Sequence, residues 1–417
     1  MNKRFIFSLH PGRYLLIFCL ALSMRAAPTN VIVPARPAPV VAASTNAVST
    51  NAVPATAFDP GVYERDRILN KAMAALTDEP VTITKSHGPY SEGGSNDFYS
   101  MGDSWFPDPT SPNGLPYKQH PGEVNPDNFN DHKKCLWQMR ENVAALAAAY
   151  KITGNNRYAT VAAEWLRVFF IDPATRMNPN LTYAQSVPGV TKGRTMGVSD
   201  VLALVEIPKA VEALQNSPGF PPAVLAGMKQ WGSNYLAWLA ANIGEEAATL
   251  SNSHNLIYWL QTATWAGLVG DEDRVADCRA QFKLFSLPGQ INADGSFNKA
   301  GKYRSYSTAV GQLDELATLC QDLSTPGENL WNFKSANSRD VHMAVEYMYP
   351  FIADKTKWPK IETTELGWPG RRVSLLFAGL AYGDSKYIDL WKRLPADPTQ
   401  EDVRRFLVVT QPVLWIK

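Results

Sequence analysis

The sequence predicts an all-α fold in which helical hairpins form an α/α toroid. Helical periodicity dominates after about residue 130, whereas the alternating polarity typical of strands is scarce. The helices come in pairs: residues 138–152 end at Gly154, a typical C-terminal stop, and residues 157–170 follow after a short turn. Such pairs either close into a toroid or open as a solenoid. Because no repeat of fixed period is visible, we favour the toroid, an incomplete barrel of helical hairpins.

The first residues have the order of a secretory signal peptide. The pattern consists of the cations Lys3, Arg4 and Arg13, the apolar stretch from Tyr14 to Leu22, and the small pair Ala26 and Ala27. The apolar run is short for a membrane span, although a single N-terminal anchor is the alternative. We expect a signal peptide over residues 1–27 and a periplasmic or secreted protein with no membrane span after its removal.

The rest of the chain divides into a tether and one large domain. Residues 28–58 are mostly Ala, Pro, Val, Thr, Ser and Asn and predict a disordered tether. A single helical domain is expected over residues 59–417. It opens with a long aromatic loop region, residues 85–130, which either packs on the core or lines a site. The later helices are predicted at 198–216, 222–243, 254–269, 273–285, 307–323, 338–353 and 371–382.

Composition limits the partners of the chain. Of its 417 residues, 40 are Lys or Arg and 39 are Asp or Glu, which gives a net charge of +1. This balance excludes the broad basic surface of a duplex nucleic-acid binder, but it allows an anionic substrate held by a few local cations. Cys135, Cys278 and Cys320 are too widely spaced for a disulfide framework or a zinc site. No acidic cluster has ligand-like spacing, so no metal-binding residues are assigned, and whether a structural metal is bound stays open.

Two clusters carry the chemistry. Ser251 to Asn255 precede an apolar helical run, and their simplest interpretation is a helix cap. A cap does not explain His254, which stands at a helix start where an anion is favoured. The second cluster follows an Asp294-Gly295 turn and contains Lys299, Lys302, Tyr303, Arg304 and Tyr306. It is either a solvated basic loop or a site where cations lower the pKa of a tyrosine enough to make it a base.

Together the clusters predict β-elimination on a uronic-acid polymer. The C5 carboxylate must be neutralised so that the C5 proton becomes acidic, and Asn, His, Arg and Lys are suitable donors. A base then removes that proton and an acid protonates the leaving O4. In β-linked mannuronate or glucuronate both atoms lie on one face, so one tyrosine can serve both steps. Guluronate needs a second group, such as His254.

The chain resembles the alginate lyase family of polysaccharide lyases over roughly residues 85–360. The resemblance rests on these strings in order: NDFYSMGDSWFPDP, NGLPY followed by Asn125-Pro126, DPATRMNPNLTYAQSVPG, GRTMGVSD, NSHN, and QINADGSF followed by a Tyr-Ser pair. It implies an α/α toroid, a secreted or periplasmic location, and eliminative cleavage of an acidic polysaccharide without a redox or nucleotide cofactor.

The resemblance also implies roles for single residues. His254 matches the family histidine, and Tyr306 matches the tyrosine that acts as acid and base. The family has Asn directly before the histidine, where this chain has Ser253, with Asn252 one step earlier. The family places Arg seven residues before the tyrosine, where this chain has Lys299; Arg304 or Lys302 could take that role instead. These departures concern the substrate, which could be alginate, polymannuronate, glucuronan or another uronate polymer.

Other matched strings supply candidate sugar-binding residues. Tyr183, Gln185 and Arg194 are expected to line the sugar groove, with loop packing as the alternative. Trp105 and Tyr117 are candidates for stacking on pyranose rings or for packing in the core.

Two other functions stay open. A glycoside hydrolase needs two facing carboxylates, and Asp97, Asp103, Asp200 and Glu206 are available without a spacing that pairs them. A non-catalytic acidic-polysaccharide-binding protein would fit the departures at Ser253 and Lys299. The sequence does not predict whether attack on the polymer is endo or exo, and it does not predict the oligomeric state.

Overall fold

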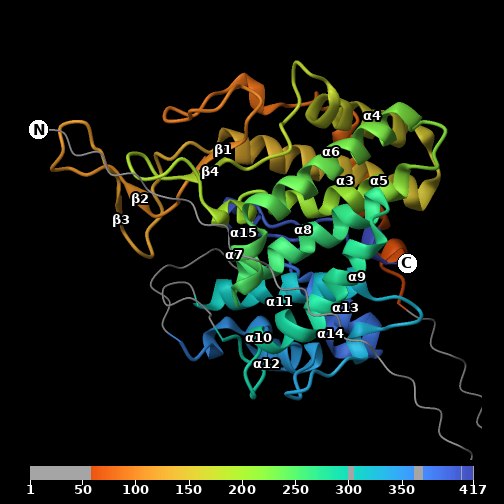
Figure 1. Cartoon of the computed structure of the whole chain (residues 1–417). Helices are drawn as coiled ribbons and strands as arrows, with labels where there is room; N and C mark the ends of the chain where they lie inside the picture. Colours follow the sequence, from red (N-terminus) through yellow and green to blue (C-terminus); the bar gives the residue numbers. More distant parts are fainter. Residues whose placement is uncertain (1–57, 299–304, 361–369, 405, 417) are drawn as a thin grey trace, which may run out of the picture. The chain divides into compact units, whose positions relative to one another are not determined.

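Helices dominate the computed structural model, which describes residues 58–298, 305–360, 370–404 and 406–416. These residues belong to one compact unit, residues 57–417. As predicted, the fold is all-α, an α/α toroid of helical hairpins (Figure 1). The expected signal peptide and the expected tether up to residue 57 lie outside the described residues, whereas Phe58, the last tether residue, packs against Trp391.

The helices have the following bounds: α1 Pro60–Tyr63, α2 Arg65–Ala75, α3 Asp131–Thr153, α4 Asn156–Leu166, α5 Glu206–Leu214, α6 Pro222–Asn242, α7 Gly244–Thr249, α8 Ser253–Val269, α9 Glu272–Gln281, α10 Leu287–Gln290, α11 Ser305–Leu323, α12 Val341–Ala353, α13 Val373–Tyr382, α14 Ser385–Arg393 and α15 Glu401–Arg404. Short 3-10 turns span Ile83–Lys85, Thr195–Ser199, Leu202–Val205, Leu330–Asn332, Lys355–Lys357 and Pro412–Trp415. Two π-helical turns, Arg167–Ile171 and Phe282–Ser286, continue α4 and α9.

One turn chemistry closes several hairpins. The pairs α3/α4, α8/α9 and α13/α14 are joined through Gly154-Asn155, Gly270-Asp271 and Gly383-Asp384. Gly154 has φ 68 and Gly270 has φ 80, in the left-handed region where a side chain is strained. The Asn or Asp that follows accepts a backbone N–H of the next helix. The same dipeptide therefore ends one helix and starts its antiparallel partner.

The long helix α8 lies at the centre of the array. It packs against α6 and α5 on one side and α11 and α9 on the other, and α11 in turn packs against α13 and α12. Figure 1 shows α8 between the group of α3, α5 and α6 and the group of α11, α13 and α14. The start of α8 is thereby placed where both groups of helices can contribute side chains.

The loop region 85–130 carries most of the little strand structure. It contains β1 (Tyr99–Met101), β2 (Trp105–Phe106) and β3 (Lys118–Gln119). β1 pairs in parallel with β4 (Tyr183–Ser186), and β2 pairs with β3. Tyr99, Met101, Tyr117 and Val187 form a small hydrophobic cluster of their own. The region therefore fits both predicted alternatives: part of it is packed, and Asp103, Ser104 and Gln119 line the cavity described below.

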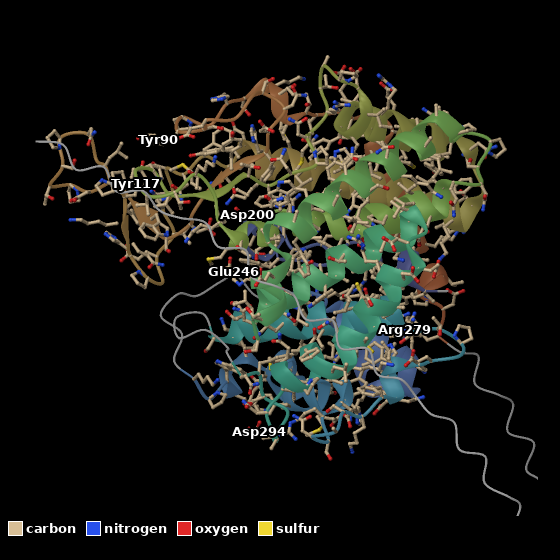
Figure 2. All side chains as sticks on the ribbon, viewed as in Figure 1. Tyr90, Tyr117, Asp200, Glu246, Arg279 and Asp294 are labelled. Atoms are coloured by element: carbon tan, nitrogen blue, oxygen red, sulfur yellow. The ribbon has the colours of Figure 1, made fainter. Side chains whose placement is uncertain are left out.

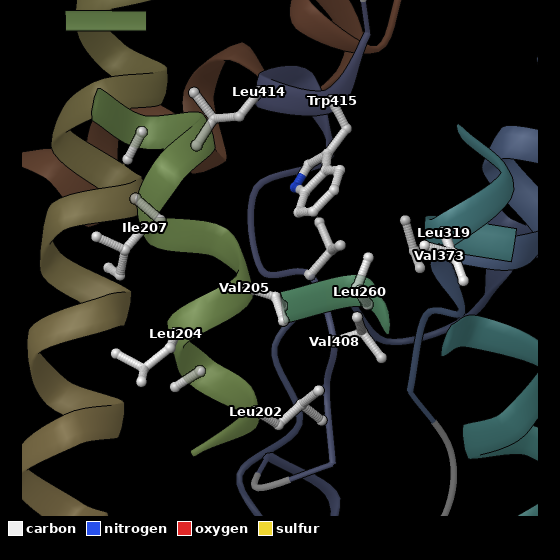
Figure 3. Close-up of a cluster of buried hydrophobic side chains, with 14 of the residues drawn as sticks. Leu202, Leu204, Val205, Ile207, Leu260, Leu319, Val373, Val408, Leu414 and Trp415 are labelled. Carbon is white, nitrogen blue, oxygen red and sulfur yellow. The ribbon is translucent and has the colours of Figure 1, made fainter. Parts of the chain in front are cut away.

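The C-terminal segment runs through the middle of the toroid. Val408, Leu414 and Trp415 pack with side chains of α5, α8, α11 and α13 (Figure 3). The fully buried Glu206 accepts the backbone N–H groups of Thr410 at 2.9 Å and Gln411 at 2.8 Å. Arg140 lies 4.0 Å from the Glu206 carboxylate and donates to the Leu407 carbonyl. Burial raises the pKa of Glu206, and Arg140 opposes that rise. Glu206 is thus a structural anchor.

The predicted elements differ from the observed ones in several places. The helix predicted at 138–152 begins earlier, at Asp131, and the short helices α1, α7, α10 and α15 were not predicted. The expected helix at 198–216 is broken into 3-10 turns before α5, and these turns leave Asp200 bonded to Ser100 and Gln185. The expected helix at 273–285 ends as α9 and continues as a π turn. The helices α2 and α14 were not predicted.

Candidate active site

A cavity of about 340 Å³ opens at the start of α8. Its walls come from the loop after β1, from β3, β4 and α3, and from the N-terminal half of α11. The lining residues are Asp103, Ser104, Gln119, Lys133, Trp137, Gln185, Arg194, Met196, Ser199, Asp200, Ser253, His254, Ser307, Thr308, Gly311, Glu315 and Phe406. In Figure 2, Asp200 lies near the middle of the molecule, and Asp294 lies well apart from it toward α10 and α12. Because the lining residues lie between residues 103 and 406, the cavity is formed by segments from most of the domain.

The cap at the start of α8 places His254 in the cavity. The Asn252 side-chain oxygen accepts the His254 backbone N–H at 3.1 Å, and Gln290 donates to the Asn252 carbonyl at 3.1 Å. Asn252 is therefore a helix cap, as the simpler interpretation held. Burial lowers the pKa of His254; the nearby Arg194 lowers it further, whereas Glu246 raises it. The imidazole is consequently neutral at neutral pH and can accept a proton.

A hydrogen-bonded network holds Arg194 at the cavity wall. Its Nε donates to the Gln185 carbonyl at 2.9 Å and its Nη2 to Gln185 Oε1 at 2.7 Å. Its guanidinium lies over the Trp105 ring, 5.7 Å from the ring centroid. A Cβ on Gly102 would stand 2.5 Å from Arg194 Nη2, so only glycine leaves room for this side chain. The cation is thus fixed in orientation before any substrate arrives.

The same network continues to a buried carboxyl group. Gln185 Nε2 donates to both carboxylate oxygens of Asp200, at 3.0 and 2.9 Å, and Ser100 donates at 2.5 Å. Burial raises the pKa of Asp200, while Lys133 lowers it. Gln185 has φ 57, an uncommon value for a residue other than glycine, and such strain is often found at functional sites. Lys133 itself binds Asp103 at 3.1 Å.

The α11 wall presents Ser307, Thr308, Gly311 and Glu315 to the cavity. Tyr306 is on the other side of the helix, because neighbouring helix positions differ by about 100° in direction. Its hydroxyl donates to the Phe351 carbonyl at 3.1 Å, and its ring packs edge-on against Trp358. It is 2% exposed. The structure does not bring Tyr306 together with His254, so its catalytic role stays a prediction.

The other predicted residues divide between the cavity and its surroundings. Gln185, Arg194, Ser253 and His254 line the cavity. Trp105 supports Arg194 from behind, and Tyr183 carries Lys192 over its ring at 5.9 Å. Tyr117 is buried against Tyr90, with ring centroids 5.8 Å apart. The predicted site residues Lys299, Lys302, Tyr303 and Arg304 lie outside the described residues.

The structure adds cavity residues that were not predicted as part of this site. Glu315 and Lys133 were missed, and Asp103 and Asp200 were considered only as hydrolase carboxylates. The Asp314-Glu315 pair inside an otherwise apolar helix was a usable signal, since buried acids need a partner or a function. The other two hydrolase candidates lie elsewhere: Asp97 accepts from Asn178 and Asn180, and Glu206 anchors the C-terminal segment.

Among the described residues, no group of three or more His, Cys, Asp or Glu side chains could hold a metal ion. Among the same residues no helix is long and apolar enough to cross a membrane.

Comparison with known proteins gives consistent matches. The family model described as alginate lyase matches residues 82–358. The crystal structure of an alginate lyase from Bacteroides ovatus is similar with 27% sequence identity and a TM-score of 0.69, covering 82% of this chain and 92% of that chain. A variant of alginate lyase A1-III complexed with tetrasaccharide shares the fold with 15% identity and a TM-score of 0.51, covering 76% of this chain and 84% of that chain. No curated protein sequence matches significantly.

Proposed function

The chain belongs to the alginate lyase family and is a polysaccharide lyase, and we propose that it cleaves a uronic-acid polymer by β-elimination in the cavity at the start of α8. The observation that carries this proposal is the pairing of Arg194 with His254 in one cavity. A fixed guanidinium suits a carboxylate, and a neutral imidazole suits proton transfer.

Arg194 is the proposed partner of the C5 carboxylate. Removal of the C5 proton places negative charge on that carboxylate, and a cation held in place stabilises the charge without rearrangement. Its bonds to Gln185 use Nε and one Nη2 hydrogen, which leaves other guanidinium N–H groups for a substrate. Lys133 adds a second cation to the same cavity. Lys133 is paired with Asp103, so Arg194 is the local cation through which a chain of net charge +1 could select a polyanion.

The proton donor for O4 is proposed to be a tyrosine near the start of α11. The bond from Tyr306 to the Phe351 carbonyl supports assigning this role to Tyr303, because Tyr306 would first have to leave a buried partner. His254 is the proposed second base, which would open guluronate linkages, where the C5 proton and O4 lie on opposite faces. With Tyr303 serving both steps, mannuronate or glucuronate linkages would be cleaved.

A substrate panel tests the proposal. Purified protein is incubated with polymannuronate, polyguluronate, mixed alginate, glucuronan and hyaluronan, and the ultraviolet absorbance of the new C4–C5 double bond is followed. At least one polymer should give unsaturated oligosaccharides. If no polymer yields them, the proposed elimination is refuted.

The cavity also contains the carboxyl groups Asp103, Asp200 and Glu315, which keeps hydrolysis as a second candidate. Saturated reducing ends without an absorbance gain would assign that reaction. Binding of oligosaccharide without any cleavage would indicate a non-catalytic sugar-binding protein.

Export is a separate proposal that rests on the cationic, apolar and small-residue order of the first residues. N-terminal sequencing of the full chain recovered from a periplasmic fraction should reveal cleavage near Ala27. A retained N-terminus in a membrane fraction would indicate an anchor instead.

A further inference from the structure

Glu315 is a buried acid in the cavity wall for which the elimination scheme has no role. It is 4% exposed and lies on α11 opposite the start of α8. Among the described residues it forms no ion pair. A buried carboxyl group without a cation is costly in its ionised form. Whether Glu315 is protonated or ionised therefore decides which hydrogen bonds it can make.

The hydrogen-bond partner of Glu315 is Ser253, which directly precedes His254. The Ser253 hydroxyl oxygen lies 2.7 Å from both Oε1 and Oε2 of Glu315. A hydroxyl has a single proton, so the direction of this bond depends on Glu315. An ionised Glu315 accepts a hydrogen bond from the Ser253 hydroxyl, so that only the lone pairs of the Ser253 oxygen face the cavity. A protonated Glu315 can donate to Ser253 instead, which frees the Ser253 proton to point into the cavity.

The surroundings favour the protonated form. Burial raises the pKa of Glu315 to about 8, the bond from Ser253 opposes this rise, and the neighbouring Asp314 adds to it. Among the described residues, the other titratable groups that line the space are His254 and, across the cavity, Arg194, Lys133, Asp103 and Asp200. The titratable groups on the other helices packed around α11 have partners other than Glu315. Arg372 pairs with Asp314, and Tyr382 bonds to the Trp331 carbonyl. His342 and Glu346 bond to Tyr387, and Arg279 pairs with Glu328.

We propose that Glu315 and Ser253 act as a proton-bearing pair in which Glu315 donates to Ser253 and Ser253 donates to the substrate carboxylate. The inference rests on the proposed function and names a further substrate-binding device within it. The pair supplies a neutral donor in the same cavity as Arg194. No covalent bond changes, and the proton stays on Glu315 while the substrate is bound. Ionisation of Glu315 reverses the donor and turns oxygen lone pairs toward the carboxylate.

The pH dependence of kcat/KM for Glu315→Gln tests the pair. Glutamine has the same shape and presents a permanent N–H donor to Ser253. Wild-type kcat/KM should fall by about tenfold in total as the pH rises through the pKa of Glu315 and then level off, because only the protonated form lets Ser253 act as a donor. Glu315→Gln should keep its activity through that range. The matched control Glu272→Gln removes an exposed carboxylate at the start of α9 and should keep the wild-type profile.

Two results would overturn the pair. One is an alkaline fall in Glu315→Gln identical to that of the wild type. The other is a Glu315→Gln variant that melts like the wild type and is inactive at every pH, which would make the carboxylate itself essential. Ser253→Asn gives an independent check, because an amide donates without a proton from Glu315. Its alkaline fall should also disappear, and Ser253→Ala should lower kcat/KM at neutral pH about tenfold, the value of one hydrogen bond of about 1.4 kcal/mol.

An infrared measurement separates this inference from the proposed function. The C=O band of a protonated carboxylic acid should be present in the wild type near neutral pH, titrate away above pH 8, and be missing in Glu315→Gln. If no uronate polymer is cleaved but the band is found, the proposed function fails and the protonated pair stands. If cleavage is found without the band, the pair is refuted and the lyase function stands.

Discussion

Arg194 allows the sharpest test of the site, because its side chain and the contacts that orient it can be changed by separate substitutions. Arg194→Ala deletes the proposed partner of the C5 carboxylate. Removing one donor that stabilises charge in the transition state typically lowers kcat by about 10²–10³-fold, or about 2.7–4 kcal/mol. Arg194→Lys keeps the charge but loses the two bonds to Gln185 and the flat stack on Trp105, so we expect a loss of about 10–100-fold.

Gly102→Ala perturbs the same cation without changing it. The new Cβ would lie 2.5 Å from Arg194 Nη2 and 2.6 Å from Trp105 Cδ1, so the guanidinium must move. This variant should reproduce the defect of Arg194→Lys. Lys192→Ala is the matched control, since it removes an exposed cation from the same loop that does not line the cavity.

The assay is the initial rate of double-bond formation on the best polymer of the panel, with thermal melting of each variant to confirm folding. Wild-type-like kcat/KM in Arg194→Ala would refute the assignment of Arg194 to the carboxylate. Wild-type activity in Gly102→Ala would show that the orientation of the guanidinium set by Gly102 and Trp105 is not required.

Three further predictions address the tyrosines, the histidine and the C-terminal anchor. Tyr303→Phe should abolish elimination. Tyr306→Phe should retain elimination but lower the free energy of unfolding by about 1 kcal/mol, because it removes the bond to the Phe351 carbonyl. The reverse pattern of elimination rates would assign the catalytic role to Tyr306. Acidification below about pH 6.5, the ordinary pKa of histidine, should lower the melting temperature, because burial lowers the pKa of His254 and the unfolded chain binds more protons. His254→Gln should show a smaller decrease, with His132, whose pKa burial also lowers, accounting for what remains; an unchanged decrease would contradict the shift. Glu206→Ala should reduce the free energy of unfolding in urea by about 3–5 kcal/mol, since it leaves buried Arg140 without its counter-charge, and a change below about 1 kcal/mol would show that the anchor is dispensable.

Much of the fold could be predicted because helix signals are local. The run that became α8 was predicted within one residue of its observed start, since Asn252 caps it and Gly270 ends it. The expected helix at 198–216 failed because its first part is held by contacts from distant segments, namely Ser100 and Gln185 bonding to Asp200. Single-sequence periodicity contains no information about such contacts. The aromatic loop region could not be divided into packed and cavity residues for the same reason.

The site was predictable only in part. His254 and Arg194 were identified from their motifs, and both line the cavity. The orientation of Tyr306 was not predictable, because a shift of one helix position decides whether a side chain meets the cavity or the core. Glu315 is 62 residues from Ser253 along the chain, so their bond exists only after α8 and α11 pack together.

By itself, the sequence determined an all-helical chain with near-zero net charge, hairpin turns set by Gly and the following Asn or Asp, and a histidine at a capped helix start. Those features depend on neighbouring residues and on local backbone geometry. Only the tertiary structure decided which charges share one cavity: Lys133, Glu315 and the pair Arg194 and Asp200 come from three separate segments, and burial there changes their pKa values or their partners. Long-range packing sets the distance between charges and their exposure to water, and these two quantities determine what the charges can do.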